Sequence, residues 1–473
     1  MSGLPAVTQA EHHRARRWDA LVLGSGLASL VAAIRLGLRG HQVLVIEEDR
    51  ARNLHPALRE PFMMAGVRDQ GVLDNLLRDL KIPLIDQRRI ANERVALQVV
   101  SPKARFDLGG PGVTAHELVA WGFCDREEAG ALVRSLVEST EAERKILLES
   151  PAVKLGRRIG RPRLAAAGAS LRGLPGDLAN PPERLAPVFD AIANALANLG
   201  STPPSPEARA RLLGCSLAGG AGFADGPPWL HGLLRRRLES VYGEFRSPGS
   251  NFELLSLDGH PALKLAATGE LWVGRALIVG APGGALADFL GPDAVRPFMG
   301  ETRPHARRLA LHLRAPPELL PQGMCPRVVL PGEVGASGQA APGRGLMTLN
   351  VSVDPQSNGP LELVARTRLA PGQQDDEAAE DEARQAMRAR LHELIPFSEG
   401  QLEERPILRP LWDDDDWLED PVRGEGWPAE VDLRLPGKAP AYRLDRAGVA
   451  GLGLEGDLLL GWRAGDAIAD ELA

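Results

Sequence analysis

Residues 21–49 read LVLGSGLASLVAAIRLGLRGHQVLVIEED and place two glycines and a serine between two apolar runs. The apolar residues before the glycines, at 20–23, suit a strand that is buried on both faces. Beyond the glycines, apolar residues recur at spacings of three and four over 27–38, which predicts a helix that ends near Gly40. A β-branched run at 43–46 predicts a second strand. The stretch is therefore predicted to be a βαβ unit with a tight turn after its first strand.

The residue types in this turn are those that a dinucleotide requires. Gly24 allows the sharp turn, Gly26 lets the backbone approach a pyrophosphate at the helix N-terminus, and the small Ser29 permits close packing of helix and strand. Glu47 ends the second strand, where it is placed to accept the ribose hydroxyls of an adenosine. Because no basic residue stands near the position of a 2′-phosphate, FAD or NAD is favoured over NADP. The alternative is a parallel βαβ unit whose glycines serve only the turn.

The far end of the chain carries a second glycine-rich turn. Residues 448–470 read GVAGLGLEGDLLLGWRAGDAIAD, in which small residues crowd the start and a helical pattern follows. With this ending, the chain resembles the phytoene desaturase-like branch of the two-dinucleotide-binding-domain flavoproteins, a family of FAD-dependent oxidoreductases that also includes amine-oxidase-like enzymes. Those proteins open with a GxGxxG/A/S βαβ unit that ends in Glu, and close with a turn of the form GxGxEG before a final helix. The alternative is a plain glycine-rich turn before a packed C-terminal helix.

The resemblance implies FAD as the cofactor, held by both ends of the chain. It also implies hydride transfer to flavin N5 from a small apolar substrate, such as an isoprenoid or a polyene. Backbone N–H groups at 454–456 would face the pyrophosphate or the flavin ring, where a helix N-terminus stabilises an anionic reduced flavin. The cofactor-binding residues expected on these grounds are Gly24, Ser25, Gly26, Leu27, Ala28, Ser29, Glu47, Glu48, Arg50, Leu454, Glu455 and Gly456.

No catalytic residue and no metal-binding set is assigned from the sequence. Five histidines are general-base candidates by residue type alone: His231, His260, His305, His312 and His392.

At 473 residues the chain is too long for one ordinary core, which predicts more than one domain. The predicted fold class is α/β, with a Rossmann-like, NAD(P)-binding-like FAD domain built from discontinuous segments and an interleaved α+β domain for a substrate or partner. The FAD domain is expected to take residues 18–100, 215–300 and 430–473. The interleaved domain takes 101–214 and 301–429, and residues 1–17 form a solvated tail. Within the interleaved domain we expect strands at 309–315, 327–331, 346–353 and 361–369, and a helix at 375–395.

One segment departs from the family pattern. After the second strand, the family has a basic residue followed by paired glycines that wrap the flavin, whereas residues 47–66 contain Arg50 and Arg52 but no glycine pair, with Gly66 as a displaced counterpart. This departure motivates a second hypothesis, a non-catalytic subunit that keeps the fold, with or without FAD, in a larger assembly. A third hypothesis, a hydrolase that uses GCSLA at 214–218 as a nucleophile elbow, lacks the glycine that the motif requires at its last position.

The composition of the chain limits which classes of partner and which cellular compartment are expected. A net charge of −7 gives no reason to expect a nucleic-acid partner. The three cysteines, Cys124, Cys215 and Cys325, are far apart and form no CxxC motif, which favours a reducing, cytoplasmic location. A basic amphipathic stretch within 151–200 leaves peripheral membrane association open, although a solvated helix face is the favoured interpretation. Homo- or hetero-oligomer formation is also left open. The acid run at 413–416 lacks the spacing of a calcium loop and is predicted to be an exposed loop.

Overall fold

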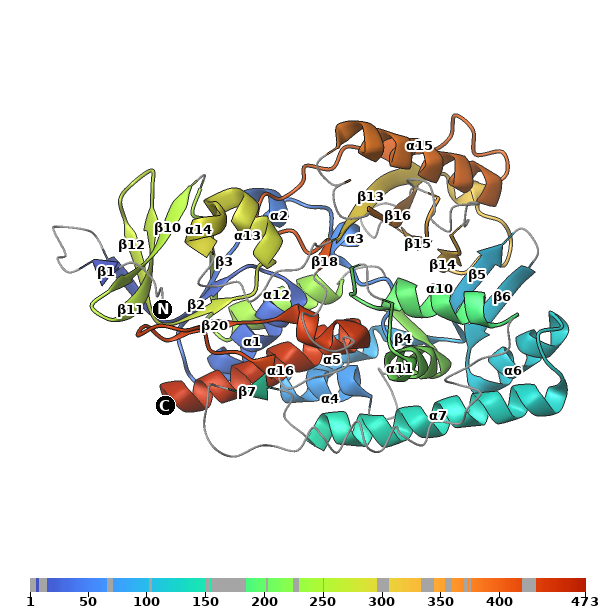
Figure 1. The fold of residues 1–473 in the computed structure, drawn as a ribbon, viewed down its shortest axis with the longest axis horizontal. Helices are drawn as coiled ribbons and strands as arrows, with labels where there is room; N and C mark the ends of the chain where they lie inside the picture. The colour runs from blue at the N-terminus through green and yellow to red at the C-terminus, as the bar shows by residue number, and fades with distance from the viewer. Residues whose placement is uncertain are drawn as a thin grey trace.

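The computed structural model describes residues 6–7, 15–65, 71–101, 104–149, 153–154, 184–200, 203–223, 229–249, 251–295, 306–332, 344–353, 360–369, 373, 376–418 and 431–473. These residues form two lobes, each built on a mixed eight-stranded sheet (Figure 1). The α/β fold class is thereby confirmed. Gly66, His305 and most of the basic stretch predicted within 151–200 lie outside the described residues.

The first sheet brings together strands from the start, the middle and the end of the chain. Its path runs β1–β10–β11–β12–β2–β3–β9, and β20 also pairs with β12. The neighbours β12, β2 and β3 are parallel, as the βαβ pattern requires. The strand bounds are β1 Ala6–Val7, β2 Ala15–Leu23, β3 Val43–Ile46, β9 Glu244–Arg246, β10 Phe252–Leu257, β11 His260–Leu265, β12 Leu271–Val279 and β20 Ala441–Arg443.

Helices cover both faces of this sheet because its central strands are buried on both sides. In β2, Ala20 and Val22 join the apolar cluster beneath α1, whereas Leu21 and Leu23 join the cluster on the opposite face, under α13. The helices of this lobe are α1 Leu27–Leu38, α2 Asp49–Arg52, α3 Pro56–Arg59, α4 Val72–Asp79, α5 Leu84–Arg88, α12 Leu230–Ser240, α13 Gly283–Leu290, α14 Pro292–Val295, the 3₁₀ helix Arg446–Leu452 and α16 Leu454–Leu472.

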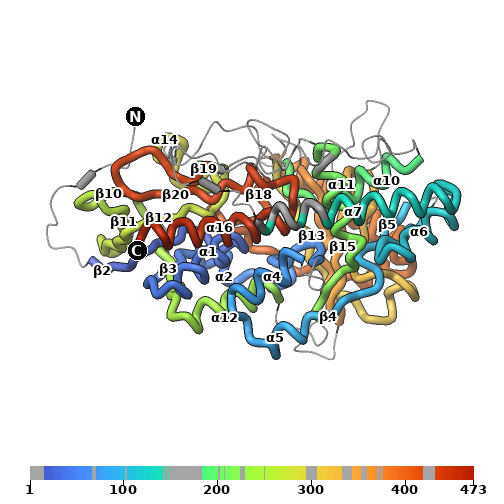
Figure 2. Tube along the Cα trace, turned by 90° about the horizontal axis from the view of Figure 1, so that it is seen from below, coloured from blue at the N-terminus to red at the C-terminus, as the bar shows by residue number. Residues whose placement is uncertain are grey.

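The first and last long helices of this lobe, α1 and α16, lie side by side in both views (Figures 1 and 2). Small residues make the close approach possible. A Cβ atom added to Gly461 would lie 2.3 Å from the carbonyl oxygen of Ala28, and one added to Gly465 would lie 2.9 Å from that of Ala32. The contact between α1 and α16 brings the C-terminal glycine-rich turn close to the N-terminal one.

The second lobe is built on the sheet β17–β13–β16–β15–β14–β5–β6, with β18 also paired to β13. Its strands are β5 Val95–Ser101, β6 Ala104–Gly109, β13 Ala306–Ala315, β14 Arg327–Leu330, β15 Met347–Val353, β16 Leu361–Leu369, β17 Glu403–Arg405 and β18 Trp417–Leu418. Its helices are α6 Pro111–Ala120, α7 Arg126–Glu149, α10 Ala186–Leu196, α11 Pro206–Leu217, the 3₁₀ helix Pro317–Leu319 and α15 Glu377–Leu394. Two short pairs complete the strands: β4 Ile90–Glu93 with β8 Gly220–Phe223, and β7 Val153–Lys154 with β19 Val431–Asp432.

The four strands and the helix expected in the interleaved domain are confirmed as β13, β14, β15, β16 and α15. Ala383, Met387 and Leu391 of α15 pack on this sheet, as their spacing of four predicts. The tail prediction is wrong where residues are described: residues 15–17 extend β2, and Ala6–Val7 pairs with β10. Residues 95–100 lie in β5 of the second sheet, although the sequence placed them with the FAD domain. The other domain boundaries stay predictions.

Within the described residues, no helix has both the length and the apolar content that a membrane crossing requires.

Candidate functional site

The predicted glycine turn lies between β2 and α1. Gly24 has a φ of +102°, and a Cβ atom there would lie 2.7 Å from the backbone nitrogen of Ala281, so glycine is required on both counts. Ser29, at the third position of the motif, faces Gly280 at the end of β12, where an added Cβ would lie 1.9 Å from the serine hydroxyl. The small residue therefore permits the close packing of helix on strand that the pattern predicts.

The two acids after β3 already have partners within the protein. The Glu47 carboxylate accepts two hydrogen bonds from the Arg235 guanidinium, at 2.6 and 2.9 Å. The Glu48 carboxylate accepts hydrogen bonds from the backbone nitrogens of Leu411 and, at 3.0 Å, Trp412. Arg50, also predicted to bind the cofactor, is exposed and donates to the carbonyl of Arg409 at 3.4 Å. Glu47 and Glu48 therefore lie at the end of β3, as the sequence predicts, and both carboxylates accept hydrogen bonds from groups of the protein.

The acid run at 413–416 is not the exposed loop that its composition predicts. Asp413 is 2% exposed; its carboxylate accepts a hydrogen bond from the Ser25 backbone nitrogen at 3.0 Å and one from the Ser25 hydroxyl at 2.6 Å. Burial raises the pKa of Asp413 to about 6, against the lowering effect of Arg59. We call residues 411–416 the acidic strap, because they cross the glycine turn from the second lobe.

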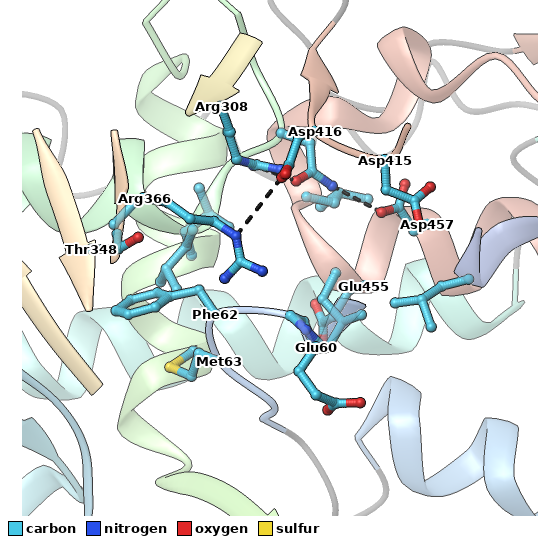
Figure 3. A pocket seen from close by; sticks show the side chains of 18 of the residues that line it. Glu60, Phe62, Met63, Arg308, Thr348, Arg366, Asp415, Asp416, Glu455 and Asp457 are labelled. Atoms are coloured by element: carbon cyan, nitrogen blue, oxygen red, sulfur yellow. Dashed lines mark hydrogen bonds and ion pairs between the residues drawn. The ribbon is translucent and has the colours of Figure 1, made fainter. Parts of the chain in front are cut away.

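Arginines from both lobes hold the other acids of the acidic strap. Asp414 pairs with Arg307 at 2.8 Å, and burial raises its pKa to about 6. Asp415 lies 3.6 Å from Arg59, and Asp416 lies 3.8 Å from Arg366 (Figure 3). The sequence alone predicts a solvated run, because the arginines that pair with these aspartates lie far away along the chain.

Two further residues fix the turn. The Arg59 guanidinium donates to the Ser25 hydroxyl at 3.0 Å. His231 lies 2.9 Å from the Ser25 carbonyl oxygen through Nε2, which therefore carries the hydrogen. Burial first, and Arg59 next, lower the pKa of His231 well below its usual value, so the ring is neutral. Neither role could be read from the sequence, because no local motif marks a residue that binds a distant backbone carbonyl.

The C-terminal residues of the predicted site meet the N-terminal ones across a cavity. Leu454 and Glu455 line it together with Leu27. Glu455 accepts two hydrogen bonds from the buried Arg211, at 3.0 and 2.7 Å. Gly456 packs against the backbone of Val449, where an added Cβ would lie 2.3 Å from the carbonyl oxygen. Ala28, the remaining predicted residue, is buried beneath α16. The two chain ends therefore converge as predicted, but Glu455 and Gly456 serve packing and ion pairing.

The cavity has a volume of about 140 Å³ and lies between the lobes (Figure 3). The apolar residues of its lining include Leu58, Phe62, Met63, Leu196, Leu346 and Leu458. The charged residues include Arg308, Arg366 and Arg368 from β13 and β16, together with Asp415, Asp416, Glu455 and Asp457. Burial lowers the pKa of Arg308 to about 9, so the guanidinium still carries its charge at neutral pH. The cavity is smaller than the ~300–1,000 Å³ of ordinary ligand pockets.

The site therefore fits a dinucleotide in part. The turn, the N-terminus of α1 and the acid at the end of β3 have the arrangement that a pyrophosphate and a ribose use. The acidic strap does not fit, because Asp413 takes the Ser25 donors and Asp415 Oδ1 lies 2.5 Å from where a Gly26 Cβ would be. In the conformation described, a pyrophosphate has no room on the turn.

Two other expectations are answered by the structure. Ser216 of the GCSLA motif lies inside α11, is fully buried and donates to the carbonyl of Leu212 at 3.0 Å, so it forms no nucleophile elbow. His312 pairs with Glu362 at 2.6 Å in the second lobe, away from the turn.

Glu60 in the cavity wall has a strongly displaced carboxyl pKa. It is buried, and its Oε1 accepts from the backbone nitrogen of His231 at 3.3 Å. Burial raises its pKa from 4.5 to about 8, although backbone hydrogen bonds and Arg366 oppose the rise. The group is therefore protonated and neutral at neutral pH.

Replacing Glu60 by Gln is expected to flatten the pH dependence of the free energy of unfolding. The folded chain keeps this proton up to about pH 8, whereas the unfolded chain loses it near 4.5. The contribution of Glu60 to the free energy of unfolding is therefore complete below the pKa of the unfolded chain, 4.5. This contribution falls as pH rises toward 8, by at most about 1.4 kcal/mol per pH unit. Urea midpoints across this range measure the slope, with the exposed Glu399→Gln as control. Equal slopes for wild type and Glu60→Gln contradict the assignment.

Comparison with known proteins agrees with this arrangement. Residues 19–70 match the FAD binding domain family, and FAD is the cofactor that the match indicates. A search of curated protein sequences finds no match.

Two solved structures share the fold over nearly the whole length. An oxidoreductase from Methanosarcina mazei superposes with a TM-score of 0.53 at 15% identity, over 96% of this chain and 100% of that one. An engineered triple variant of a putrescine oxidase gives a TM-score of 0.50 at 13% identity, over 97% of this chain and 100% of that one. At these identities the likeness shows the fold alone.

Proposed function

We propose that the chain is an FAD-dependent oxidoreductase, phytoene desaturase-like, with the substrate in the cavity between the lobes. The observation that carries the proposal is the convergence of both chain ends. Leu27, directly after the glycine turn, and Leu454 and Glu455, at the start of α16, line one cavity. The match to the FAD binding domain covers the glycine turn and the acid after β3. Hydride transfer to the flavin is the reaction that the resemblance implies.

The cavity walls support a substrate with two unlike parts. The leucine, methionine and phenylalanine side chains suit an apolar part of an isoprenoid or polyene, since a cavity of about 140 Å³ takes only a segment of such a molecule. Arg308, Arg366 and Arg368 also line the cavity, together with Asp415 and Asp416. Their guanidinium groups favour a substrate that carries a carboxylate or another anion at one end.

An absorption spectrum of the freshly purified full chain tests the proposal. We expect visible flavin bands, either as purified or after incubation with FAD, and bleaching of these bands by dithionite. Bound flavin that resists reduction would contradict redox activity, and a chain that takes up no FAD under any condition would overturn the proposal.

A second candidate function is a non-catalytic subunit that keeps the fold. The acidic strap is the observation that favours it, because protein carboxylates stand where the phosphates of a cofactor would bind. A colourless protein whose spectrum does not change on addition of FAD, and which co-purifies in a stable assembly, is the result expected for this candidate.

A further inference from the structure

We propose that the acidic strap is an intramolecular occupant of the dinucleotide site and that FAD has to displace it in order to bind. The inference rests on the proposed function and adds to it a regulated entry step. Residues 411–416 belong to the connection between β17 and β18 of the second lobe, so their place on the turn is a contact between lobes.

The acidic strap uses the same donors that a pyrophosphate would use. Backbone N–H groups at the start of a helix following a glycine turn are a ready-made anion site. Here the Ser25 N–H and hydroxyl both donate to the Asp413 carboxylate, at 3.0 and 2.6 Å. Arg59 donates to the same hydroxyl and lies 3.6 Å from Asp415. Protein carboxylates therefore occupy an anion site that is fully built.

The acidic strap also fills the space that glycine leaves open. Gly26 has no side chain, which in a dinucleotide-binding turn lets the phosphates approach the backbone. Asp415 Oδ1 lies 2.5 Å from the position of a Gly26 Cβ, so the carboxylate takes this space. A phosphate and the Asp415 side chain cannot be there together.

The remaining part of the acidic strap covers the nucleoside end. Glu48, next to the acid expected to bind ribose, accepts from the backbone nitrogens of Leu411 and Trp412. The Trp412 ring is 1% exposed and packs edge-on against Phe252, with ring centroids 5.5 Å apart. The acidic strap thus contacts Glu48 at one end and the glycine turn at the other.

The acidic strap continues into the second lobe at its C-terminal end and packs against the first lobe through Trp412 and the aspartates. Its C-terminal end is tied to the second lobe by the pair Asp414–Arg307 and by the pairing of β18 with β13. Its contacts with the first lobe are the ones described above, a hydrogen bond from Arg446 to the Asp415 carbonyl oxygen at 3.4 Å, and the packing of Trp412 on Phe289 in the apolar core. Withdrawal would uncover the Ser25 donors and the Arg59 guanidinium for the phosphates of FAD.

The test is an FAD titration of the full chain, followed by tryptophan and flavin fluorescence. Asp413→Ala/Asp415→Ala removes both carboxylates from the turn and is expected to lower the dissociation constant for FAD at least tenfold. Glu399→Ala/Glu403→Ala, two exposed acids, makes the same change in net charge and is the matched control, expected to leave the constant unchanged. Asp415→Ala alone serves if the double variant does not fold, because the Asp415 side chain is 35% exposed.

Hydrogen exchange of the wild-type chain supplies a second readout. On addition of FAD, we expect protection of the amides of residues 22–30 and faster exchange in residues 408–418. Equal FAD affinity of wild type and variants, with exchange in 408–418 unchanged, overturns the inference and leaves the proposed function standing. Absence of FAD binding in every folded variant overturns both.

Discussion

Gly461→Val is expected to lower the free energy of unfolding by more than about 3 kcal/mol. The substitution places a branched side chain where a single added carbon already lies 2.3 Å from the Ala28 carbonyl oxygen and 2.8 Å from the Val31 side chain. Since both neighbours belong to α1, relief requires that the two helices separate. Urea unfolding followed by circular dichroism measures the loss.

Gly232→Val is the matched control for this prediction. Gly232 is also helical, in α12, but the nearest atom to an added Cβ is the end of the Arg236 side chain, 3.9 Å away. The same substitution there is expected to change the stability by less than about 1 kcal/mol. Comparable losses at both positions would contradict the assignment of the α1–α16 contact as the cause.

Glu455→Ala is expected to destabilise the chain by roughly 3–5 kcal/mol, because it leaves a buried guanidinium without its carboxylate. The Arg211 side chain is 1% exposed, and Glu455 accepts two of its hydrogen bonds. Cys215 lies 3.2 Å from the same carboxylate oxygen. The measurement is again the urea midpoint, read together with the thermal midpoint.

Two controls separate burial from charge in this second prediction. Asp470→Ala, on the same helix, breaks an exposed pair with Arg39 and is expected to cost less than about 1 kcal/mol. The double variant Arg211→Met/Glu455→Leu removes both charges and is expected to recover much of the lost stability. A double variant as unstable as Glu455→Ala alone would show that packing, and not the loss of the carboxylate beside the buried Arg211 guanidinium, explains the lower stability.

Local patterns were sufficient to predict the first βαβ unit and four strands of the second sheet, β13, β14, β15 and β16. In these elements, and in the helices α1 and α15, the spacing of apolar residues predicts which face is buried. The resemblance at residues 448–470 also predicted that the two ends of the chain converge, and the small residues between α1 and α16 explain how they do so.

The acidic strap could not be predicted from local patterns. Four consecutive aspartates read as a solvated loop, because such a run gains nothing from burial unless cations meet it. The cations that meet it here are Arg59, Arg307 and Arg366, which come from three separate segments. Long-range ion pairs leave no periodic signal, so only the folded arrangement reveals them. For the same reason, the sequence did not predict the pairing of Glu455 with Arg211 or the hydrogen bond between His231 and the Ser25 carbonyl.

The pairing of α1 with α16 has a consequence for synthesis on the ribosome. The apolar face of α1 is complete once Leu38 has been added, whereas the helix that covers it begins only at Leu454. The nascent chain therefore cannot complete its nucleotide-binding lobe until translation has passed Leu472. We expect ribosome-bound intermediates to expose this face and to depend on chaperones until that helix has emerged.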